Sequence, residues 1–185
     1  LRDLTPIRPN LYLWQGDITR LAVDAIVNAA NSKLLGCFVP NHSCIDNAIH
    51  TAAGVELRLA CQELMQEQGE DETTGQAKMT KAYNLPSRYV LHTVGPIIYD
   101  EVTDLERQQL ASSYEECLNL AYEKGLRSLA FCCISTGEFR FPNEEATKIA
   151  IETVLQFQKE HPDMVVIFNV FKDIDYTIYQ ALLKK

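Results

Sequence analysis

Short strand-like segments alternate with longer helix-like segments along the chain, and this alternation constrains the fold more than any other feature. The segments predicted as strands are 11–14, 25–28, 77–83, 89–94, 126–134 and 164–171. The segments predicted as helices are 44–66, 104–125, 143–157 and the stretch that follows residue 171. Strands separated by helices of this length predict an α/β fold, with a mixed or largely parallel sheet and helices on both of its faces.

The predicted helices also carry boundary signals. Apolar residues recur at spacings of three and four through 44–66, and Gly54 in the middle is expected to bend or split this helix. Asp104 and Asn143 are expected to cap the next two helices, because their side chains accept hydrogen bonds from the first N–H groups of a helix.

Length and charge narrow the class of protein. The 185 residues suit a single domain over 1–185, and the initial Leu1 leads us to expect missing residues before it. Lys and Arg number 17 and Asp and Glu 25, a net charge of −8 that argues against a non-specific nucleic-acid binder. Apolar runs such as 164–168 are too short to span a bilayer, so we expect no membrane partner. We expect a monomer.

The chain has six cysteines and no segment typical of a secretion signal. We therefore expect a reducing, cytoplasmic location, with free thiols or a metal site in place of disulfides. Cys132 and Cys133 are adjacent on a predicted strand, so their side chains face opposite ways, and we expect both to be core residues.

Ligands of such sheets bind at the carboxyl ends of the strands, so the loops that follow them are the candidate sites. Gly16-Asp17-Ile18-Thr19 follows the first strand, where an Asp can accept from an exocyclic amine; on this tetrapeptide alone a cap or turn is the favoured interpretation. The loop 28–32 presents two Asn side chains able to contact a sugar, although Asn is also a common turn former.

A third loop, 134–139, leaves a buried strand and leads into a helix. Its small Ser, Thr and Gly residues would expose consecutive backbone N–H groups, which suits a diphosphate but also a plain turn. Phe139 is harder to explain by turn chemistry and could pack on a ribose or on the core.

Cys37, His42 and Cys44 lie within eight residues, in a loop before a helix. Thiolate and imidazole are the ligands that Zn²⁺ prefers, and three protein ligands leave a fourth position open for catalysis. The alternative, which spacing leaves equally open, is two apolar cysteines and a loop histidine. Asp46 could cap the helix, orient a water or act as a base. His50 is interpreted as a packing histidine.

Taken in order, these motifs resemble the macrodomain family over nearly the whole chain. The matching stretches are Gly16-Asp17-Ile18-Thr19, 23–31, Ile45-Asp46 with Ile49-His50 and 52–54, Thr74-Gly75 with 92–96, and 134–142. The resemblance implies a three-layer α/β/α fold with a central mixed sheet that binds ADP-ribose.

The resemblance also implies roles for single residues. Asp17 would accept from the adenine amine, with the Ile18 backbone beside it, and Phe171 would lie against the adenine ring. Asn31 would contact the distal ribose, and Asp46 matches the acidic residue that catalytic macrodomains use for hydrolysis. The diphosphate would be wrapped by Ser135, Thr136, Gly137, Glu138 and Phe139, the last of which would pack near the distal ribose.

One departure from the family pattern concerns the segment before Asp46. Hydrolytic macrodomains carry a run of glycines there, whereas this chain keeps only Gly36 and has 37–44 in its place. This segment resembles that of zinc-containing microbial macrodomains, in which a Cys/His/Cys-bound zinc lies beside the distal ribose. The resemblance therefore implies Zn²⁺ on Cys37, His42 and Cys44.

The leading hypothesis is a zinc-dependent hydrolase that removes mono-ADP-ribose from modified protein side chains, with Asn31 orienting the ribose and Asp46 assisting proton transfer. The open zinc position would polarise a ribose oxygen or activate a water. The alternatives are a non-catalytic ADP-ribose reader, a deacetylase of O-acetyl-ADP-ribose that uses the same residues, and a purely structural zinc.

Overall fold

The computed structural model describes residues 4–37 and 44–184. Within them, six strands form one sheet in the order β1-β6-β5-β2-β4-β3. The strands are β1 (Leu11–Gln15), β2 (Ala25–Ala29), β3 (Ala77–Lys81), β4 (Tyr89–Thr93), β5 (Ser128–Phe131) and β6 (Val165–Val170). Every neighbouring pair is parallel except β3 and β4, which are antiparallel, so the sheet is mixed as predicted.

Gly54 divides the first long helical segment in two, as its position in the sequence predicts. Helix α1 (Ile45–Ala53) ends at this glycine, and helix α2 (Val55–Gln68) begins directly after it. The φ of Gly54 is +95°, a conformation that side chains on Cβ disfavour, and an added Cβ would meet the Asn84 amide at 3.0 Å. A glycine is therefore required at this corner.

The two expected caps are each wrong by one residue. Helix α3 (Asp104–Glu123) is capped by Thr103, whose N–H donates to the Glu106 carboxylate in a capping box, so Asp104 is already helical. Pro142 precedes helix α4 (Asn143–Glu160). The Asn143 side chain donates to Asp175 of helix α5 (Asp173–Leu183) at 2.6 Å, and this tertiary contact replaces a local cap.

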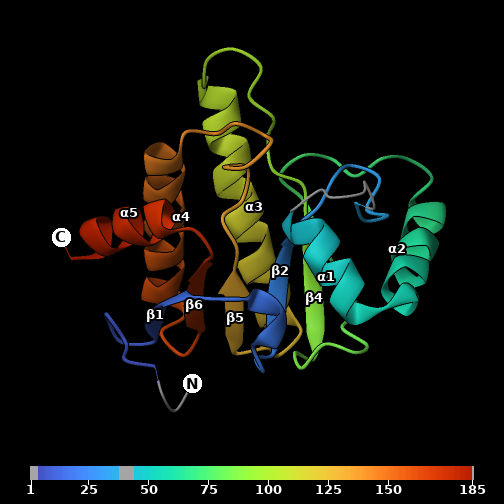
Figure 1. Cartoon of the computed structure of the whole chain (residues 1–185), viewed down its shortest axis with the longest axis horizontal. Coiled ribbons are helices and arrows are strands. Elements are labelled where there is room, and N and C mark those ends of the chain that lie inside the picture. The colour runs from blue at the N-terminus through green and yellow to red at the C-terminus, as the bar shows by residue number, and fades with distance from the viewer. Residues whose placement is uncertain (1–3, 38–43, 185) are drawn as a thin grey trace.

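Helices cover both faces of the sheet, which confirms the predicted three-layer α/β/α fold. Figure 1 shows α1 in front of the sheet and α3 behind it. Helix α1 packs on β2, α3 on β3 and β4, α5 on β1 and β6, and α4 packs against α3 and α5. Strands buried on both faces are almost wholly apolar, and β2, β4, β5 and β6 follow this rule apart from a few polar residues.

Those few polar residues are the exceptions that matter, because buried polar groups need partners. Asn28 and His92 are fully buried on neighbouring strands, and Asn169 is 5% exposed on β6.

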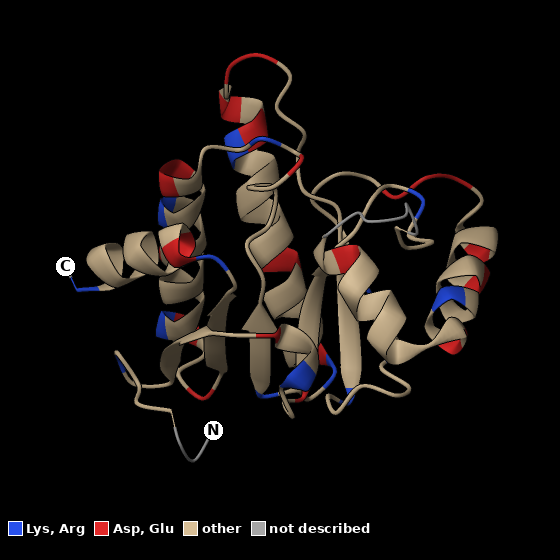
Figure 2. Ribbon diagram, in the orientation of Figure 1, with Lys and Arg blue, Asp and Glu red and all other residues tan. Residues whose placement is uncertain are grey.

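Charged side chains are dispersed over the protein, and Figure 2 shows Lys and Arg scattered over several elements. Among the described residues no helix has the length and apolar character needed to cross a membrane.

Candidate active site

A cavity of about 710 Å³ opens at the carboxyl ends of the parallel strands. The loops that follow β1, β6, β5 and β2, four adjacent strands of the sheet, all contribute to its wall. Parallel strands point their carboxyl ends to one edge, so loops far apart in the sequence meet there. The cavity therefore lies where the sheet topology predicts a ligand.

All predicted site residues that the structure describes line this cavity, although lining does not establish their roles. They are Asp17, Ile18, Asn31, Cys37, Cys44, Asp46, Ser135, Thr136, Gly137, Glu138, Phe139 and Phe171. His42, the remaining predicted metal ligand, lies outside the described residues.

Asp17 performs the capping role that its tetrapeptide favours and still faces the cavity. Its Oδ1 accepts from the Thr19 N–H at 3.0 Å and from the Thr19 hydroxyl at 2.6 Å, which caps the short 3₁₀ helix η1 (Ile18–Arg20). Across the same end of the cavity, Phe171 is 76% exposed. A large exposed aromatic ring in a cavity wall offers a surface on which a flat ring can stack.

The loop after β5 is a closed turn held by three backbone hydrogen bonds. The Phe141 N–H donates to the Ser135 carbonyl at 2.8 Å, and the Arg140 N–H to the Gly137 carbonyl at 3.0 Å. The Ile98 N–H donates to the Phe139 carbonyl at 2.7 Å and ties the loop to the segment after β4. The loop is thus preformed before any ligand binds.

Ser135 is the strained residue of this loop. Its φ is +67°, a left-handed conformation that costs a non-glycine residue about 1 kcal/mol or more, and such strain clusters at functional sites. Its buried Oγ has no hydrogen-bond partner among the described residues. Gly95 lies against it, since a Cβ on Gly95 would meet Ser135 Oγ at 2.0 Å.

The loop after β2 is organised by the Asn31 side chain. Its Oδ1 accepts from the Lys33 N–H at 3.1 Å, and its Nδ2 contacts the Gly36 carbonyl at 3.4 Å. Leu34 in the same loop has a φ of +57° and is fully buried, so it anchors the loop to the core. From this anchored loop the chain returns to the cavity wall at Cys37.

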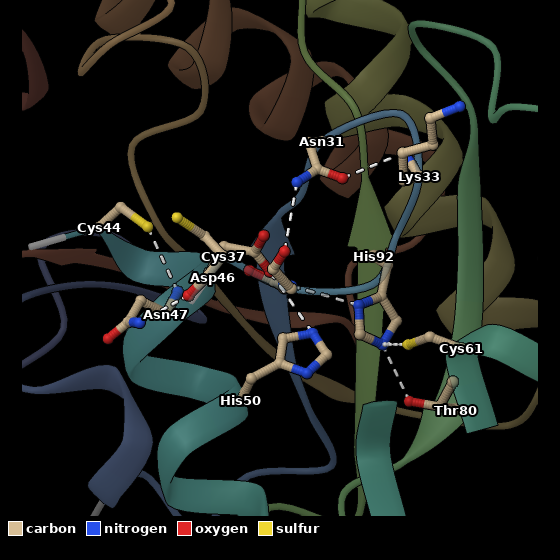
Figure 3. A network of polar contacts seen from close by, with 12 residues as sticks. Asn31, Lys33, Cys37, Cys44, Asp46, Asn47, His50, Cys61, Thr80 and His92 are labelled. Atoms are coloured by element: carbon tan, nitrogen blue, oxygen red, sulfur yellow. Dashed lines mark hydrogen bonds and ion pairs between the residues drawn. The ribbon is translucent and has the colours of Figure 1, made fainter. Parts of the chain in front are cut away.

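The two thiols meet at the start of α1. Figure 3 shows the Cys37 and Cys44 sulfur atoms side by side above Asp46. The Asn47 N–H donates to Cys44 Sγ at 3.3 Å and its amide Nδ2 to the Cys37 carbonyl at 2.6 Å, so one residue holds both sides of the segment. Burial, and then the adjacent Cys37, raise the pKa of Cys44 to about 11.

Adjacent cysteine thiols are ligands of the type that Zn²⁺ prefers, and a bound zinc would displace their protons and take the thiolates. The donor set at this wall therefore fits Zn²⁺ as far as the described residues reach.

Asp46 is 4% exposed and lies one helical turn before His50. Burial raises its pKa to about 6, and the opposing effect is a 2.8 Å hydrogen bond that Asn28 Nδ2 donates to Asp46 Oδ1. His50 is buried as predicted, with Nε2 3.5 Å from the same oxygen, and burial lowers the pKa of His50 to about 4. At neutral pH the carboxyl is thus ionised beside a neutral imidazole.

With this geometry established, comparison with known proteins gives the family. The macro domain family model matches residues 27–150. The chain belongs to the macro domain family. Curated relatives of this macrodomain are named protein-ADP-ribose hydrolase. One from Treponema medium is 55% identical, covering 99% of this chain and 72% of the relative. One from Staphylococcus aureus strain MRSA252 is 52% identical, covering 100% and 71%.

Solved macrodomain structures match the fold closely. A variant of the Oceanobacillus iheyensis macrodomain with ADPR has a TM-score of 0.88 and 42% identity, covering 98% of this chain and 96% of that one. The Trypanosoma brucei macrodomain in complex with ADP-ribose has a TM-score of 0.85 and 37% identity, covering 99% and 75%.

Several cavity residues of the macrodomain were not predicted from the sequence. They are Gly95, Cys132, Cys133, Asn143, Asn169, Lys172 and Asp175. Cys132 and Cys133 were expected in the core: Cys132 is 6% exposed, Cys133 is half-buried, and both reach the cavity wall. Asn169 carried a usable signal, since an amide within the apolar run 164–171 must find a partner, here the Gly16 carbonyl at 3.2 Å.

Proposed function

We propose that this macrodomain is a zinc-dependent hydrolase that binds ADP-ribose in the cavity and removes mono-ADP-ribose from modified protein side chains. Two observations support ADP-ribose binding and hydrolysis. Relatives above 50% identity over the whole chain are named protein-ADP-ribose hydrolase, and a structural neighbour at 42% identity was solved with ADPR. The zinc dependence rests on the cavity itself.

Each part of ADP-ribose would have its own set of residues in the cavity. Asp17 and the Ile18 backbone would take the adenine amine, with the ring against Phe171. The preformed loop with Ser135, Thr136, Gly137 and Glu138 would take the diphosphate on its backbone N–H groups, which need no basic side chain. Asn31 and Phe139 would take the distal ribose. All of these residues line the same cavity.

The observation that carries the proposal is the meeting of Asp46, Cys37 and Cys44 at one wall of this cavity. Together with His42, the two thiols would hold Zn²⁺ with one coordination position open. When bound, zinc would supply a Lewis acid beside the distal ribose. A reader has no need of such a donor set or of a buried carboxylate next to it.

The chain's own residues supply the rest of the chemistry. Burial sets the pKa of Asp46 at about 6, so at neutral pH its carboxylate can accept a proton from a nucleophile or a ribose hydroxyl. Asn28 holds the carboxylate by a 2.8 Å hydrogen bond. Asn31 would orient the sugar so that its glycosidic carbon faces the nucleophile.

Release of ADP-ribose from a mono-ADP-ribosylated protein, measured with the metal content of the same sample, tests the proposal. We expect about one zinc per chain, loss of turnover on chelation, and recovery when zinc returns. Cys44→Ala should lose both metal and turnover, whereas Cys117→Ala, a buried cysteine on α3 outside the cavity, should keep both.

Full turnover by zinc-free Cys44→Ala would overturn the zinc mechanism. ADP-ribose binding without turnover of any modified protein would identify a reader instead. Faster hydrolysis of O-acetyl-ADP-ribose than of the mono-ADP-ribosylated protein would identify a deacetylase. A melting temperature that falls on chelation, with full activity in the remaining folded protein, would identify a structural zinc.

A further inference from the structure

A chain of buried polar side chains runs from Asp46 into the core across three adjacent strands. Asn28 on β2 lies beside His92 on β4, at paired positions in the sheet, and Thr80 lies on β3. Asn28 and His92 are 0% exposed and Thr80 is 7% exposed. Buried polar groups at the centre of a sheet weaken the core unless they are paired, so their presence calls for an explanation.

The contacts along this chain are short and continuous. Asn28 Nδ2 lies 2.8 Å from Asp46 Oδ1 and 3.3 Å from His92 Nδ1. His92 Nε2 lies 2.9 Å from Thr80 Oγ1 and 3.7 Å from Cys61 Sγ. Figure 3 shows the imidazole between these partners, with one nitrogen toward the active-site side and the other toward the core.

These contacts specify one tautomer. An amide nitrogen carries two hydrogens and no lone pair for bonding, so Nδ2 of Asn28 donates to both Asp46 and His92. His92 Nδ1 must then be bare, and Nε2 carries the proton and donates it to Thr80. Full burial lowers the pKa of His92 to about 3, which keeps the imidazole neutral and Nδ1 available as an acceptor.

We propose that His92 is a positioning residue of the active site, which fixes the Asn28 amide with its NH₂ group toward Asp46 and thereby orients the carboxylate at the cavity wall. The reason is geometric. The turned-over amide would place its oxygen against both the Asp46 carboxylate and the bare Nδ1, two acceptors that repel it. His92 lies outside the cavity wall and acts through Asn28.

A buried metal is the competing explanation of the same residues. The ligand atoms of His50, Cys61 and His92 all lie within 4.8 Å of one another. A metal on His92 Nε2 would take the lone pair of the nitrogen that carries the proton, and Nδ1 would then be protonated and face the Asn28 NH₂ group. Burial also raises the pKa of the Cys61 thiol to about 12, so the hydrogen-bonded arrangement is favoured.

Two substitutions at position 92 separate positioning from packing. In His92→Asn, the side-chain oxygen can take the place of Nδ1 and accept from Asn28. In His92→Gln, the polar group reaches toward the place of Nε2 and Thr80, and the acceptor for Asn28 is lost. We expect kcat of His92→Asn to exceed that of His92→Gln by at least about tenfold, because small misplacement of a catalytic group costs up to about a hundredfold.

The readout must exclude a general loss of structure. ADP-ribose affinity by calorimetry should agree within about threefold for the two variants, since neither removes a cavity residue, so the effect falls on kcat and not on binding. Equal kcat values for the two variants would show a packing role and overturn the proposal. Zinc content above one per chain that falls only on His92 substitution would establish the metal site instead.

A measurement on the unmodified protein keeps the inference testable if both variants unfold. Long-range ¹H–¹⁵N NMR of the imidazole shows which nitrogen bears the proton, and we expect Nε2. A proton on Nδ1 would overturn the proposal whatever the variants do.

The inference rests on the proposed role of Asp46. The variant Asp46→Ala therefore distinguishes a failure of the proposed function from a failure of the inference. Full turnover by Asp46→Ala contradicts the proposed function. Loss in Asp46→Ala with equal kcat in the two His92 variants contradicts the inference alone.

Discussion

The side-chain amide of Asn47 donates a 2.6 Å hydrogen bond to the backbone carbonyl of Cys37, while its own backbone N–H donates to Cys44 Sγ. Asn47 is no metal ligand itself, but it fixes both predicted cysteine ligands relative to α1. Loss of a hydrogen-bond partner that orients a metal ligand commonly weakens the metal affinity of the site.

Asn47→Ala is therefore expected to weaken zinc binding by about tenfold or more, the usual cost of losing an outer-shell partner. Titration with a competing chromogenic chelator measures the zinc affinity directly. Asn119→Ala on α3, outside the cavity, is the matched control and should leave the affinity unchanged. An unaltered zinc affinity in Asn47→Ala would show that the segment is positioned by other contacts.

Gly95→Ala is expected to lower ADP-ribose affinity by more than about tenfold. The new Cβ would lie 2.0 Å from Ser135 Oγ and 2.7 Å from Ile134 Cγ2, so these two side chains must move, and we expect the loop 134–139 to move with them. Calorimetry gives the affinity, and circular dichroism verifies that the fold persists. Wild-type affinity in a folded variant would contradict the assignment of this loop to the ligand.

Phe171→Ala is expected to weaken ADP-ribose binding by about 1–3 kcal/mol, the usual contribution of an aromatic ring stacked on a base. Its ring is 76% exposed, so the melting temperature should hardly change. Tyr99, 85% exposed and outside the cavity, is the matched control. Binding of ribose 5-phosphate, which lacks adenine, should be the same in Phe171→Ala and wild type; an equal loss for both ligands would place the adenine elsewhere.

The free energy of unfolding is expected to fall in acid because of His92. Burial lowers the pKa of His92 to about 3 in the fold, against about 6.5 when unfolded, so the unfolded chain binds the proton more tightly. The stability from a neutral His92 is complete above about pH 6.5 and is lost as the pH falls toward 3.

Urea unfolding at pH 7 and pH 5 tests this directly. Wild type should lose about 2 kcal/mol more than His92→Asn between these values, from 1.36 kcal/mol per pKa unit. His92→Asn serves as the control, because it shares every other titrating group with the wild type. Parallel losses in both proteins would show that His92 is already protonated or solvated in the fold.

The fold could be predicted from the sequence because its signals are local. The apolar runs 25–28, 89–94 and 164–171 became β2, β4 and β6, and Gly54 divided two helices where its backbone freedom suggested. The caps were less predictable: Asn143 suits a cap by composition, but a contact with Asp175, 32 residues away, decided its role.

The candidate site was predictable where a loop follows a strand. Asp17, Asn31, Ser135 and Phe171 all lie within four residues after a strand, and all four line the cavity. Gly95 also follows a strand, but it has no side chain that would indicate a site. Its importance depends on the distance to Ser135, 40 residues away, and no local pattern reports that distance.

The sequence by itself determined the order of strands and helices, the loops that carry polar residues, and the Cys/His/Cys spacing before Asp46, because each of these depends on neighbouring residues. Only the tertiary structure decided what Asn28 and His92 do. In the sequence they are two polar residues inside apolar strands. The parallel pairing of β2 with β4 places them side by side beneath Asp46, and burial then makes Asn28 Nδ2 and both ring nitrogens of His92 find partners within the core.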